Sequence, residues 1–542
     1  MKILRLLLTI AIVSLGTAVT LQPNSAIAAE KVTFSVPIFG QFSLLVADLE
    51  KYADSGEVTP KLAFYTKFLD PIAFQQFRHI LQTSLIDDPV TVYRLTNTPL
   101  GEEILTRLGT LIYTHPERNG IYAIRAALIA GTAEPEGLTL LNFFRHFPTQ
   151  EIQLNTASAI SLFQEMKHLF KDRETTIKAI AEASKQEIAL SQDSSSLNRQ
   201  KFTNLSQSGQ YQTRHQKITL TVDNSRQTSL GFNDSYELKA EMYLPLEQNQ
   251  RAPLIVIDHG FGAKAADYQE LAKHLASYGY IVALPEHSSR INNEQQAVLS
   301  TEVAVNFSSV EFYRRPKDIT QLLNELEKHP DFSQQINWSE IGIMGHSLGG
   351  TTALLVSGAN LDWDKIQNVC SQDNFLFNVS LFLQCRAKNL PPGDYNFRDS
   401  RIKAVMALNS IGSVVLSQKS MSKITIPTLI VGGTQDFIAP FVNEQVYPFV
   451  WLDTTHKYLA TIVGGGHVSR TSQSNATAVE DVFLPSNSIG DQDYLKALSL
   501  AFFEAHVRDR SEYQSYLTAD YAQKISHPEL PLRLIRSLTE NH

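Results

Sequence analysis

Residues 341–350 read IGIMGHSLGG, an apolar run that ends in the pattern Gly-x-Ser-x-Gly and continues into the helix-forming TTALLV. A strand, a tight turn and a helix in this order form the context that a nucleophile elbow requires. Ser347 would stand on the turn, with its hydroxyl pushed out of the sheet edge. Gly345 and Gly349 fit because a Cβ at either position would collide with the neighbouring strand or helix. We therefore predict that Ser347 is a nucleophile, against the alternative of a purely structural glycine turn.

Apolar runs that end at polar residues recur on both sides of this stretch. Six have the composition of strands: APLIVIDHG, YIVALPEH, IGIMGHS, IKAVMALN, IPTLIVGGTQD and YLATIVGGGH. Helical patterns such as YQELAKHLASYG lie between several of them, which indicates the α/β class, with a mostly parallel sheet covered by helices on both faces. KITLTV and NDSYELKAEMYLP predict an edge hairpin ahead of this sheet. Ligands bind beyond the carboxyl ends of such strands, and the polar candidates all lie at these ends.

A serine hydroxyl needs a base to take its proton, and the base needs an acid to orient it. His467 follows YLATIVGGG at the end of the last of these six strands, and the three glycines would let its loop bend toward the elbow. Asp436 ends IPTLIVGGTQD, one strand earlier, where its carboxylate would accept a hydrogen bond from His467. The alternatives are a surface-loop histidine and an aspartate that caps the helix after it.

An oxyanion hole requires two backbone N–H groups directed to the place where negative charge develops. Leu348 would supply one, because it directly follows the nucleophile. Phe261, in the loop HGFGAKAADY, would supply the other, and Gly260 and Gly262 would permit the close backbone approach. A simple tight turn at HGFG is the alternative.

Together these segments resemble the platelet-activating-factor acetylhydrolase-like branch of the α/β-hydrolases, a family of lipases and esterases. The resemblance rests on PLIVIDHGFGA, LASYGYIVALPEHSSR and IGIMGHSLGG, and covers roughly residues 215 to 510. It implies an α/β-hydrolase fold and the order serine, acid, histidine along the chain. Glu286 and His287 match the family's loop and are expected to support the elbow through hydrogen bonds. In the acetylhydrolases the acid follows the strand that here ends at Asn409, so the acid must stand one strand later, at Asp436.

The chain has 542 residues, which is too long for one ordinary core. Residues 1–28 have the positive start, apolar stretch and small-residue cleavage site of a signal peptide, so we expect export, to the periplasm or the cell exterior. A retained signal anchor is the alternative. Residues 32–183 are predicted to form an all-α domain, and residues 184–214 a polar linker. Residues 215–542 would form the catalytic domain, with a cap or lid insert at about 360–400.

The helical half resembles a domain of unknown function that accompanies such hydrolases in bacteria, and this resemblance implies no activity. Several of its aromatic residues fall at helical spacing. This spacing favours core packing, with a lipid-facing surface for peripheral membrane contact as the alternative. The residues concerned are Phe64, Tyr65, Phe68, Phe143 and Phe144.

Composition excludes several partners. A net charge of −8 and a pI near 6.0 argue against a nucleic-acid partner. The sequence has no zinc-spaced Cys/His cluster, Walker loop or G-x-G-x-x-G after a strand, so we expect neither a metal nor an organic cofactor. Cys370 and Cys385 lie 15 positions apart, and a disulfide in an oxidising compartment and two free buried thiols both remain open.

The expected function is that of an exported serine hydrolase. Ser347, His467 and Asp436 would cleave carboxylic esters of lipids or other apolar molecules through an acyl-enzyme. Two alternatives are kept. The same triad would also serve acyl transfer to an alcohol, or the protein would be a non-catalytic scaffold whose helical half docks a partner protein or a membrane.

Overall fold

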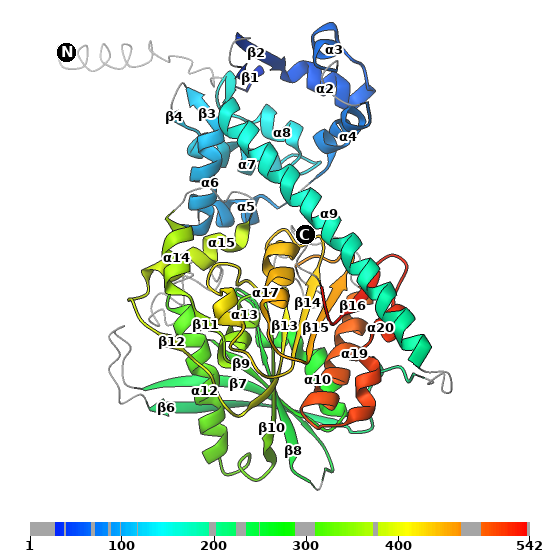
Figure 1. Cartoon of the computed structure of the whole chain (residues 1–542). Helices are drawn as coiled ribbons and strands as arrows, with labels where there is room; N and C mark the ends of the chain where they lie inside the picture. Colours follow the sequence, from blue (N-terminus) through cyan, green and yellow to red (C-terminus); the bar gives the residue numbers. More distant parts are fainter. Residues whose placement is uncertain are drawn as a thin grey trace, which may run out of the picture. The chain divides into compact units, whose positions relative to one another are not determined.

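The computed structural model describes most of the chain in two compact units. The N-terminal unit comprises Met1–Asn97 and Gly101–Ser161, and the C-terminal unit comprises Thr98–Leu100 and Leu162–His542 (Figure 1). Of the predicted signal peptide, only Ala28 is among the described residues. The described residues are 28–36, 40–66, 71–84, 88–97, 99–115, 118–194, 202–223, 235–248, 250–287, 309–371, 378–467 and 489–538.

The N-terminal unit contains a sheet as well as helices, so the prediction of an all-α domain is wrong. Five strands lie in the order β2-β1-β5-β3-β4, with β1 antiparallel to β2 and parallel to β5. The strands are two to six residues long, too short for alternation to stand out from helical spacing in the sequence. Their bounds are β1 Lys31–Val36, β2 Gly40–Leu45, β3 Ile112–His115, β4 Arg118–Asn119 and β5 Glu151–Leu154.

Helices fill the rest of this unit. Phe143 is 8% exposed and lies in an apolar cluster against which Phe144 also packs, as the helical spacing predicted, whereas Phe64 is 44% exposed. Phe68 lies outside the described residues. The helices are α2 Val46–Ser55, α3 Pro60–Thr66, α4 Pro71–Gln82, α5 Pro89–Thr96, α6 Pro99–Leu111, α7 Ile121–Thr132 and α8 Leu140–Arg145.

The long helix α9, Thr156–Ser194, runs into the segment predicted as a linker, so that prediction is wrong for its first part. Within the C-terminal unit, Ile180 is fully buried and the Glu187 carboxylate accepts a hydrogen bond from the backbone N–H of Arg536. The described part of the segment beyond residue 201 is not a free tether either, since Leu205 is buried in an apolar cluster of the same unit. The Ser/Gln-rich composition correctly indicated a polar segment. Composition alone does not show which of its polar residues are held in place by tertiary contacts.

The C-terminal unit contains the α/β sheet that the sequence predicted. Nine strands lie in the order β16-β15-β14-β13-β10-β8-β9-β7-β6. The six central strands are parallel, and β6 and β7 form the predicted antiparallel hairpin at one edge. At the other edge β16, which the sequence did not indicate, pairs antiparallel with β15. Their bounds are β6 Thr213–Asp223, β7 Ser235–Pro245, β8 Ala252–Asp258, β9 Ile281–Glu286, β10 Ile336–His346, β13 Ile402–Leu408, β14 Thr428–Gly433, β15 Lys457–Ile462 and β16 Leu532–Ile535.

Both faces of this sheet are apolar and covered, which explains why its central strands are continuous apolar runs. Along β8, Leu254 and Val256 belong to one apolar cluster, and Ile255 and Ile257 belong to the other. Helices α12 (Glu311–Lys328) and α13 (Leu348–Val356) contribute to the first cluster, and α10 (Gln269–Ser277) and α19 (Ile489–His506) to the second (Figure 1).

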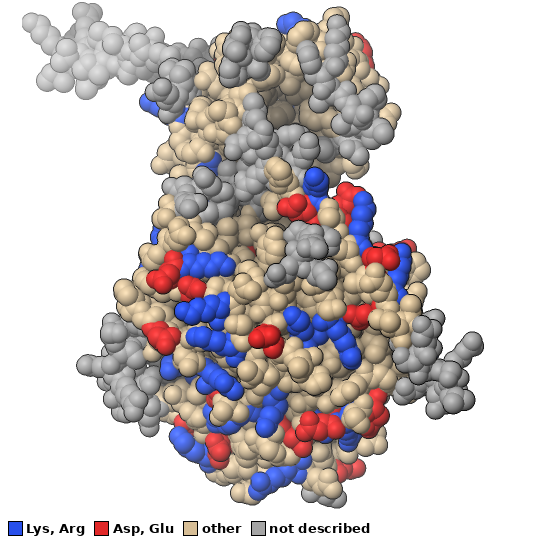
Figure 2. Space-filling model, in the orientation of Figure 1, with Lys and Arg blue, Asp and Glu red and all other residues tan. Residues whose placement is uncertain are grey.

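Shorter helices complete the C-terminal unit. The face shown in Figure 2 carries positive and negative side chains intermixed over this unit. None of the helices in the described ranges has the length and apolar character needed to cross a membrane. The shorter helices are η1 Ala265–Tyr268, α16 Gln418–Met421, η3 Val442–Val446, α17 Tyr447–Trp451, η4 Ser511–Tyr516 and α20 Ala519–Ile525.

The predicted cap or lid is a partly helical insert that packs into the C-terminal core. Its apolar side chains Ile366, Leu381 and Leu383 belong to the same cluster as α12 and α13. Its closure over the site stays a prediction. The described elements are β11 Asn360–Leu361, α14 Trp363–Cys370, α15 Val379–Gln384, η2 Cys385–Asn389 and β12 Tyr395–Asn396.

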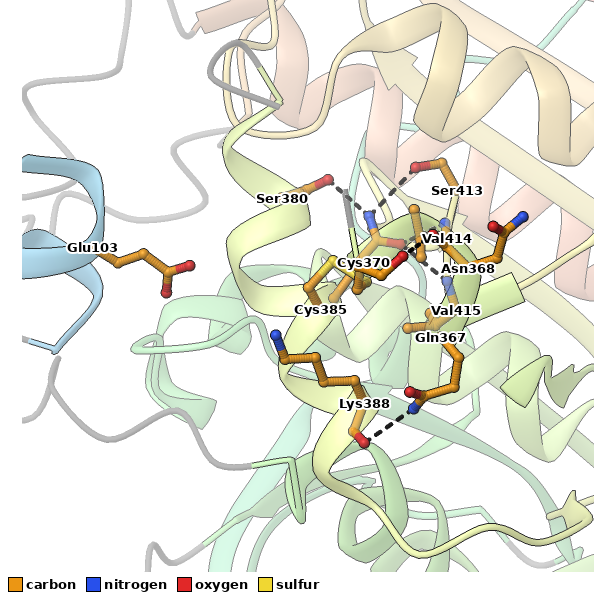
Figure 3. Close-up of a disulfide and its surroundings, with 12 residues drawn as sticks. Glu103, Gln367, Asn368, Cys370, Ser380, Cys385, Lys388, Ser413, Val414 and Val415 are labelled. Atoms are coloured by element: carbon orange, nitrogen blue, oxygen red, sulfur yellow. Dashed lines mark hydrogen bonds between the residues drawn. A yellow bond between two sulfur atoms is a disulfide. The ribbon is translucent and has the colours of Figure 1, made fainter. Parts of the chain in front are cut away.

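A disulfide joins Cys370 at the end of α14 to Cys385 at the start of η2 (Figure 3), which settles the open alternative in favour of the bond. Gln384, next to this bond, accepts hydrogen bonds from the N–H groups of Val414 and Val415. It also donates to the fully buried carboxylate of Glu444. The bridge therefore constrains a segment that side-chain contacts already attach to the loop after β13.

Removing the bridge should lower the free energy of unfolding by about 3 kcal/mol, because a closed loop of this length restricts the unfolded chain by that amount. Urea unfolding of the double variant Cys370→Ala/Cys385→Ala, followed by circular dichroism, measures the loss. Reductant should destabilise the original protein and leave the double variant unchanged. Equal stabilities of the oxidised protein and the double variant would contradict the expectation.

Candidate active site

Ser347 stands on the turn between β10 and α13, as the sequence predicted. Its backbone has φ 55° and ψ −121°, a left-handed conformation that a residue other than glycine adopts only under strain. The side chain is 5% exposed. Such strain is stored where the surrounding structure imposes it, and here it turns the serine hydroxyl out of the sheet.

The two elbow glycines are required by close packing, as expected. A Cβ on Gly345 would lie 2.1 Å from the carbonyl oxygen of Gly349, in the first turn of α13. A Cβ on Gly349 would lie 2.2 Å from the carbonyl oxygen of Asp258, the last residue of β8. The helix can therefore begin directly above the sheet only because neither position carries a side chain.

The structure brings Ser347, His467 and Asp436 together. The Ser347 Oγ lies 3.0 Å from Nε2 of His467, and Nδ1 of the same ring lies 2.7 Å from Oδ2 of Asp436. An Nδ1–H that donates to the carboxylate leaves the lone pair of Nε2 facing the serine hydroxyl. The other carboxylate oxygen, Oδ1, accepts from the N–H groups of Ile438 and Ala439. Asp436 thus both orients the imidazole and holds its own turn.

The loop that carries His467 is fixed through its backbone. The carbonyl oxygen of His467 accepts hydrogen bonds from His346 Nε2, at 2.6 Å, and from Asn409 Nδ2, at 2.8 Å. The amide oxygen of Asn409 accepts from the N–H of Gly433, at the end of β14. The amide that stands in the acetylhydrolase acid position therefore connects the acid strand to the histidine loop.

The HGFG loop lies against the elbow, where an oxyanion hole would form. A Cβ on Gly260 would lie 3.1 Å from Nδ1 of His346 and 3.3 Å from the Cβ of Ser347, so a side chain there would crowd the elbow. Gly262 has φ +78°, a conformation that favours glycine. Leu348 is the first residue of α13, and the N–H groups of a first helical turn have no partner within the helix. Donation by the N–H groups of Leu348 and Phe261 to an oxyanion beside Ser347 stays a prediction.

His287 lies close to the site, but it reaches the elbow indirectly. Its Nε2 is 2.6 Å from Oδ1 of Asp258, which ends β8, and its Nδ1 is 3.1 Å from Oδ2 of Asp318 on α12. Glu286 is half-buried at the end of β9, and its backbone pairs with Lys239 of β7. The hydrogen bonds expected from His287 therefore reach Asp258, at the end of β8, and not the elbow itself. The role of Glu286 stays a prediction.

Two family models match the chain in separate segments. The model described as an alpha/beta hydrolase of unknown function (DUF1400) matches residues 28–155, and the chlorophyllase model matches residues 202–367. Among curated proteins, platelet-activating factor acetylhydrolase of Canis lupus familiaris is 27% identical over 158 residues, 23% of this chain and 36% of the relative. The Cavia porcellus enzyme of the same name is 26% identical over 152 residues, which cover 22% of this chain and 35% of the relative. The chain thus spans about a third of the length of the curated relatives it matches.

The sheet, the elbow and these matches agree. The chain has the α/β-hydrolase fold and is similar to hydrolases of the lipase and esterase type. The chlorophyllase match begins at residue 202, within the segment predicted as a linker, which agrees with its packing on the C-terminal unit.

Three supporting residues of this α/β-hydrolase were not recognised from sequence. His346 lies inside the elbow motif, where only Ser347 was assigned a role, and Asn409 was considered only as the residue in place of an acid. Arg315 lies in the run RRPKD, which has the appearance of a solvated helix face, yet it is 3% exposed. A polar residue directly at a strand end was an available signal for Asn409. For Arg315 the available signal was helical spacing, because it falls three residues after Phe312 and four before Ile319, on the apolar face of α12, whereas Arg314 does not.

Acid should destabilise the folded protein between about pH 6 and pH 4. Burial lowers the pKa of His259 and of His346 to about 3, so both stay neutral when folded, whereas the same rings in the unfolded chain take up a proton near 6.5. Their stabilisation is therefore complete above pH 6.5 and is lost as the pH falls toward 3. His287, whose pKa is raised, is already protonated in both states over this range.

Urea unfolding at a series of pH values measures this loss. The variant His346→Gln removes one of the two rings and should show a shallower fall in unfolding free energy with acid. A free energy of unfolding that stays constant between pH 6 and pH 4 would contradict the assignment of neutral buried rings.

Removing the amide of Asn409 should slow the reaction of Ser347 with a fluorophosphonate probe by about tenfold, because the histidine loop loses one of its two side-chain donors and small misplacements of catalytic groups are costly. The labelling rate of Asn409→Ala measures the effect. Asn396→Ala, which removes a similar amide on the surface strand β12, is the control and should label at the original rate. Equal rates for all three proteins would show that Asn409 does not support the site.

Proposed function

We propose that this α/β-hydrolase is a serine hydrolase that cleaves carboxylic esters through a Ser-His-Asp triad. The observation that carries the proposal is the continuous contact from Ser347 Oγ to His467 Nε2, at 3.0 Å, and from His467 Nδ1 to Asp436 Oδ2, at 2.7 Å. Both ring nitrogens are used, and all three side chains come from loops at the carboxyl ends of parallel strands.

The chemistry follows from this arrangement. The Ser347 oxygen attacks the ester carbonyl carbon while His467 Nε2 accepts the hydroxyl proton, and Asp436 stabilises the imidazolium that forms. The N–H groups of Leu348 and Phe261 donate to the oxyanion of the tetrahedral intermediate. His467 then returns the proton to the departing alcohol, which leaves an acyl-enzyme on Ser347. Water activated by the same imidazole releases the acid.

The substrate class that we propose is a lipid or another apolar ester. Phe261 follows Gly260 in the HGFG loop, which lies against Ser347, and Phe437 directly follows Asp436 and is 59% exposed. Aromatic side chains next to the reacting groups favour apolar acyl or alcohol groups. The name of the curated relatives, an acetylhydrolase, and that of the matching family model, chlorophyllase, are consistent with ester chemistry.

We also propose that the protein acts after export. The basic and apolar start of the sequence has the pattern of a signal peptide. The Cys370–Cys385 disulfide supports this location, because such bonds persist mainly in oxidising compartments.

The variant Ser347→Ala tests the proposal. Hydrolysis of p-nitrophenyl acyl esters should fall at least about a thousandfold, because the triad acts as a unit, and the melting temperature should be unaffected. Ser357→Ala, which alters another buried serine at the end of α13, is the control and should keep full activity. Labelling of the original protein by a fluorophosphonate should occur at Ser347 and be absent from Ser347→Ala.

Unchanged turnover in folded Ser347→Ala would defeat the proposal. Absence of both labelling and ester turnover in the original protein would favour the scaffold alternative. A product ester formed with an added alcohol, in place of free acid, would assign the same triad to acyl transfer.

A further inference from the structure

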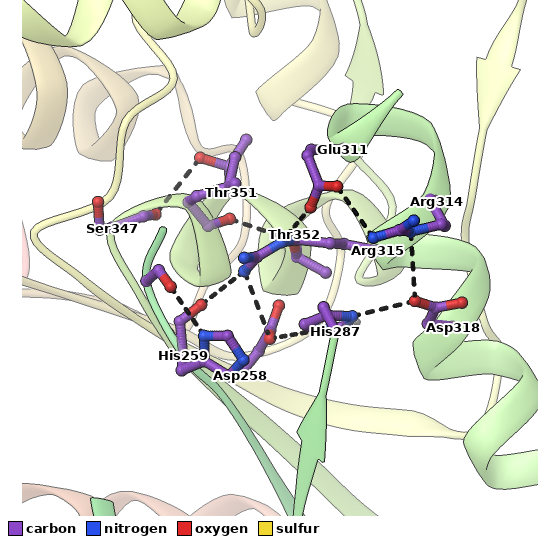
Figure 4. A network of polar contacts seen from close by, with 12 residues as sticks. Asp258, His259, His287, Glu311, Arg314, Arg315, Asp318, Ser347, Thr351 and Thr352 are labelled. Atoms are coloured by element: carbon purple, nitrogen blue, oxygen red, sulfur yellow. Dashed lines mark hydrogen bonds and ion pairs between the residues drawn. The ribbon is translucent and has the colours of Figure 1, made fainter. Parts of the chain in front are cut away.

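A buried network of charged side chains lies beneath the HGFG loop (Figure 4). Asp258, Asp318 and Arg315 are each at most 3% exposed, and the His287 side chain is fully buried between the two aspartates. Buried charges are costly to solvate and persist in proteins where they are paired and hydrogen-bonded. The network also includes Glu311 and Arg314 (Figure 4), so three acidic groups face three basic ones and the charges balance.

The charges in this network stabilise one another. Burial alone would raise the pKa of Asp258, but His287 and Arg315 lower it to about 2. Burial alone would lower the pKa of His287, but Asp258 and Asp318 raise it above its ordinary value. Because each ring nitrogen of His287 faces a carboxylate, the imidazolium form donates to both.

One bond leads out of this network to the backbone of the loop. Arg315 Nη1 donates to the carbonyl oxygen of His259 at 2.6 Å, and Nε of the same guanidinium donates to Glu311 at 3.0 Å. The next carbonyl, that of Gly260, accepts from Nδ1 of the His259 ring at 2.8 Å. Two successive carbonyl groups are therefore held in place.

The direction of these carbonyls sets the direction of the next N–H. The described chain has no cis peptide bonds, and in a trans peptide the C=O of one residue and the N–H of the next point in opposite directions. With the Gly260 carbonyl fixed, the Phe261 N–H points in the opposite direction within the same peptide plane. The Arg315 guanidinium thus holds the backbone at His259. Phe261, whose N–H is the second donor of the proposed oxyanion hole, lies two residues later.

We propose that Arg315, anchored by the Asp258–His287–Asp318 cluster, is a positioning residue that preorganises the Phe261 N–H of the oxyanion hole. This inference rests on the proposed function. Arg315 does not touch the substrate. It acts by fixing the His259 carbonyl. The planar guanidinium donates to this carbonyl and to the Glu311 carboxylate at the same time, and a lysine ammonium does not reproduce this pair of contacts.

The test is Arg315→Lys, which keeps the charge and removes the fork. For a p-nitrophenyl ester, kcat should fall about ten- to a hundredfold, because one misplaced oxyanion donor costs up to that order, while KM changes less than twofold. The inhibition constant of a trifluoromethyl ketone, which forms a tetrahedral oxyanion on the serine, should rise by the same factor. A merely structural role would reduce the fraction of active enzyme, counted by fluorophosphonate titration, without changing this constant.

Arg401→Lys is the matched control. Arg401 also makes several side-chain bonds to α12, to Asn324 and Glu327, and binds Asp399, but none of its hydrogen bonds or ion pairs within the described residues involves the HGFG loop. This variant should lose stability and keep both kcat and the ketone inhibition constant. Parallel losses in the Arg401 and Arg315 variants would overturn the positioning role.

Unchanged kcat and ketone inhibition in folded Arg315→Lys would also overturn the inference, while leaving the proposed function intact. If this variant does not fold, Glu311→Gln weakens the second anchor of the Arg315 guanidinium, together with the contact of Glu311 to Arg314, and keeps the bond from Arg315 to His259. It should give smaller but parallel changes in both constants, and no change in either would contradict the inference. Absence of ester turnover and Ser347 labelling in the original protein would instead defeat the proposed function itself.

Discussion

The close approach of helix α13 to strand β8 is the constraint on which the site depends. Gly349 lies so near the carbonyl of Asp258 that no side chain fits between them, and Gly345 closes the same turn from the strand side. This packing forces Ser347 into its left-handed conformation, and the many backbone contacts of the parallel sheet hold it there. The same contact places the end of β8, and therefore the HGFG loop, beside the nucleophile.

The loops around Ser347 are held mainly by side chains that bind backbone atoms. His346 and Asn409 hold the carbonyl of His467, and Arg315 holds the carbonyl of His259. Glu444 accepts from the N–H groups of Gly412 and Ser413, in the loop after β13. In a buried environment an unmade hydrogen bond is expensive, so each such contact limits a loop to one conformation. Loops that lack regular structure thereby hold catalytic groups within fractions of an ångström.

The N-terminal half illustrates how local pattern and tertiary structure diverge. Its strands are short, and β2 passes into α2 within one apolar run, FSLLVADLEKY, so the spacing of apolar residues predicted a helix throughout. Strand pairing between residues as distant as Lys31 and Glu151 decides the sheet, and a local pattern carries no information on such pairing. The described parts of the Ser/Gln-rich segment after it likewise pack through contacts within the C-terminal unit.

The sequence alone determined the parallel sheet, the elbow and the positions of the serine, acid and histidine, because each depends on a short local pattern. Continuous apolar strands mark a sheet buried on both faces, glycines mark the close approaches, and polar residues at strand ends mark the rim where ligands bind. Only the tertiary structure decided which side chains hold those groups in place. Helical spacing places Arg315, but not the adjacent Arg314, on the buried face of α12. It does not show that the Arg315 guanidinium reaches the HGFG loop whereas Arg314 binds Glu311. That difference arises from how α12 packs on the sheet, through contacts between residues far apart in the chain.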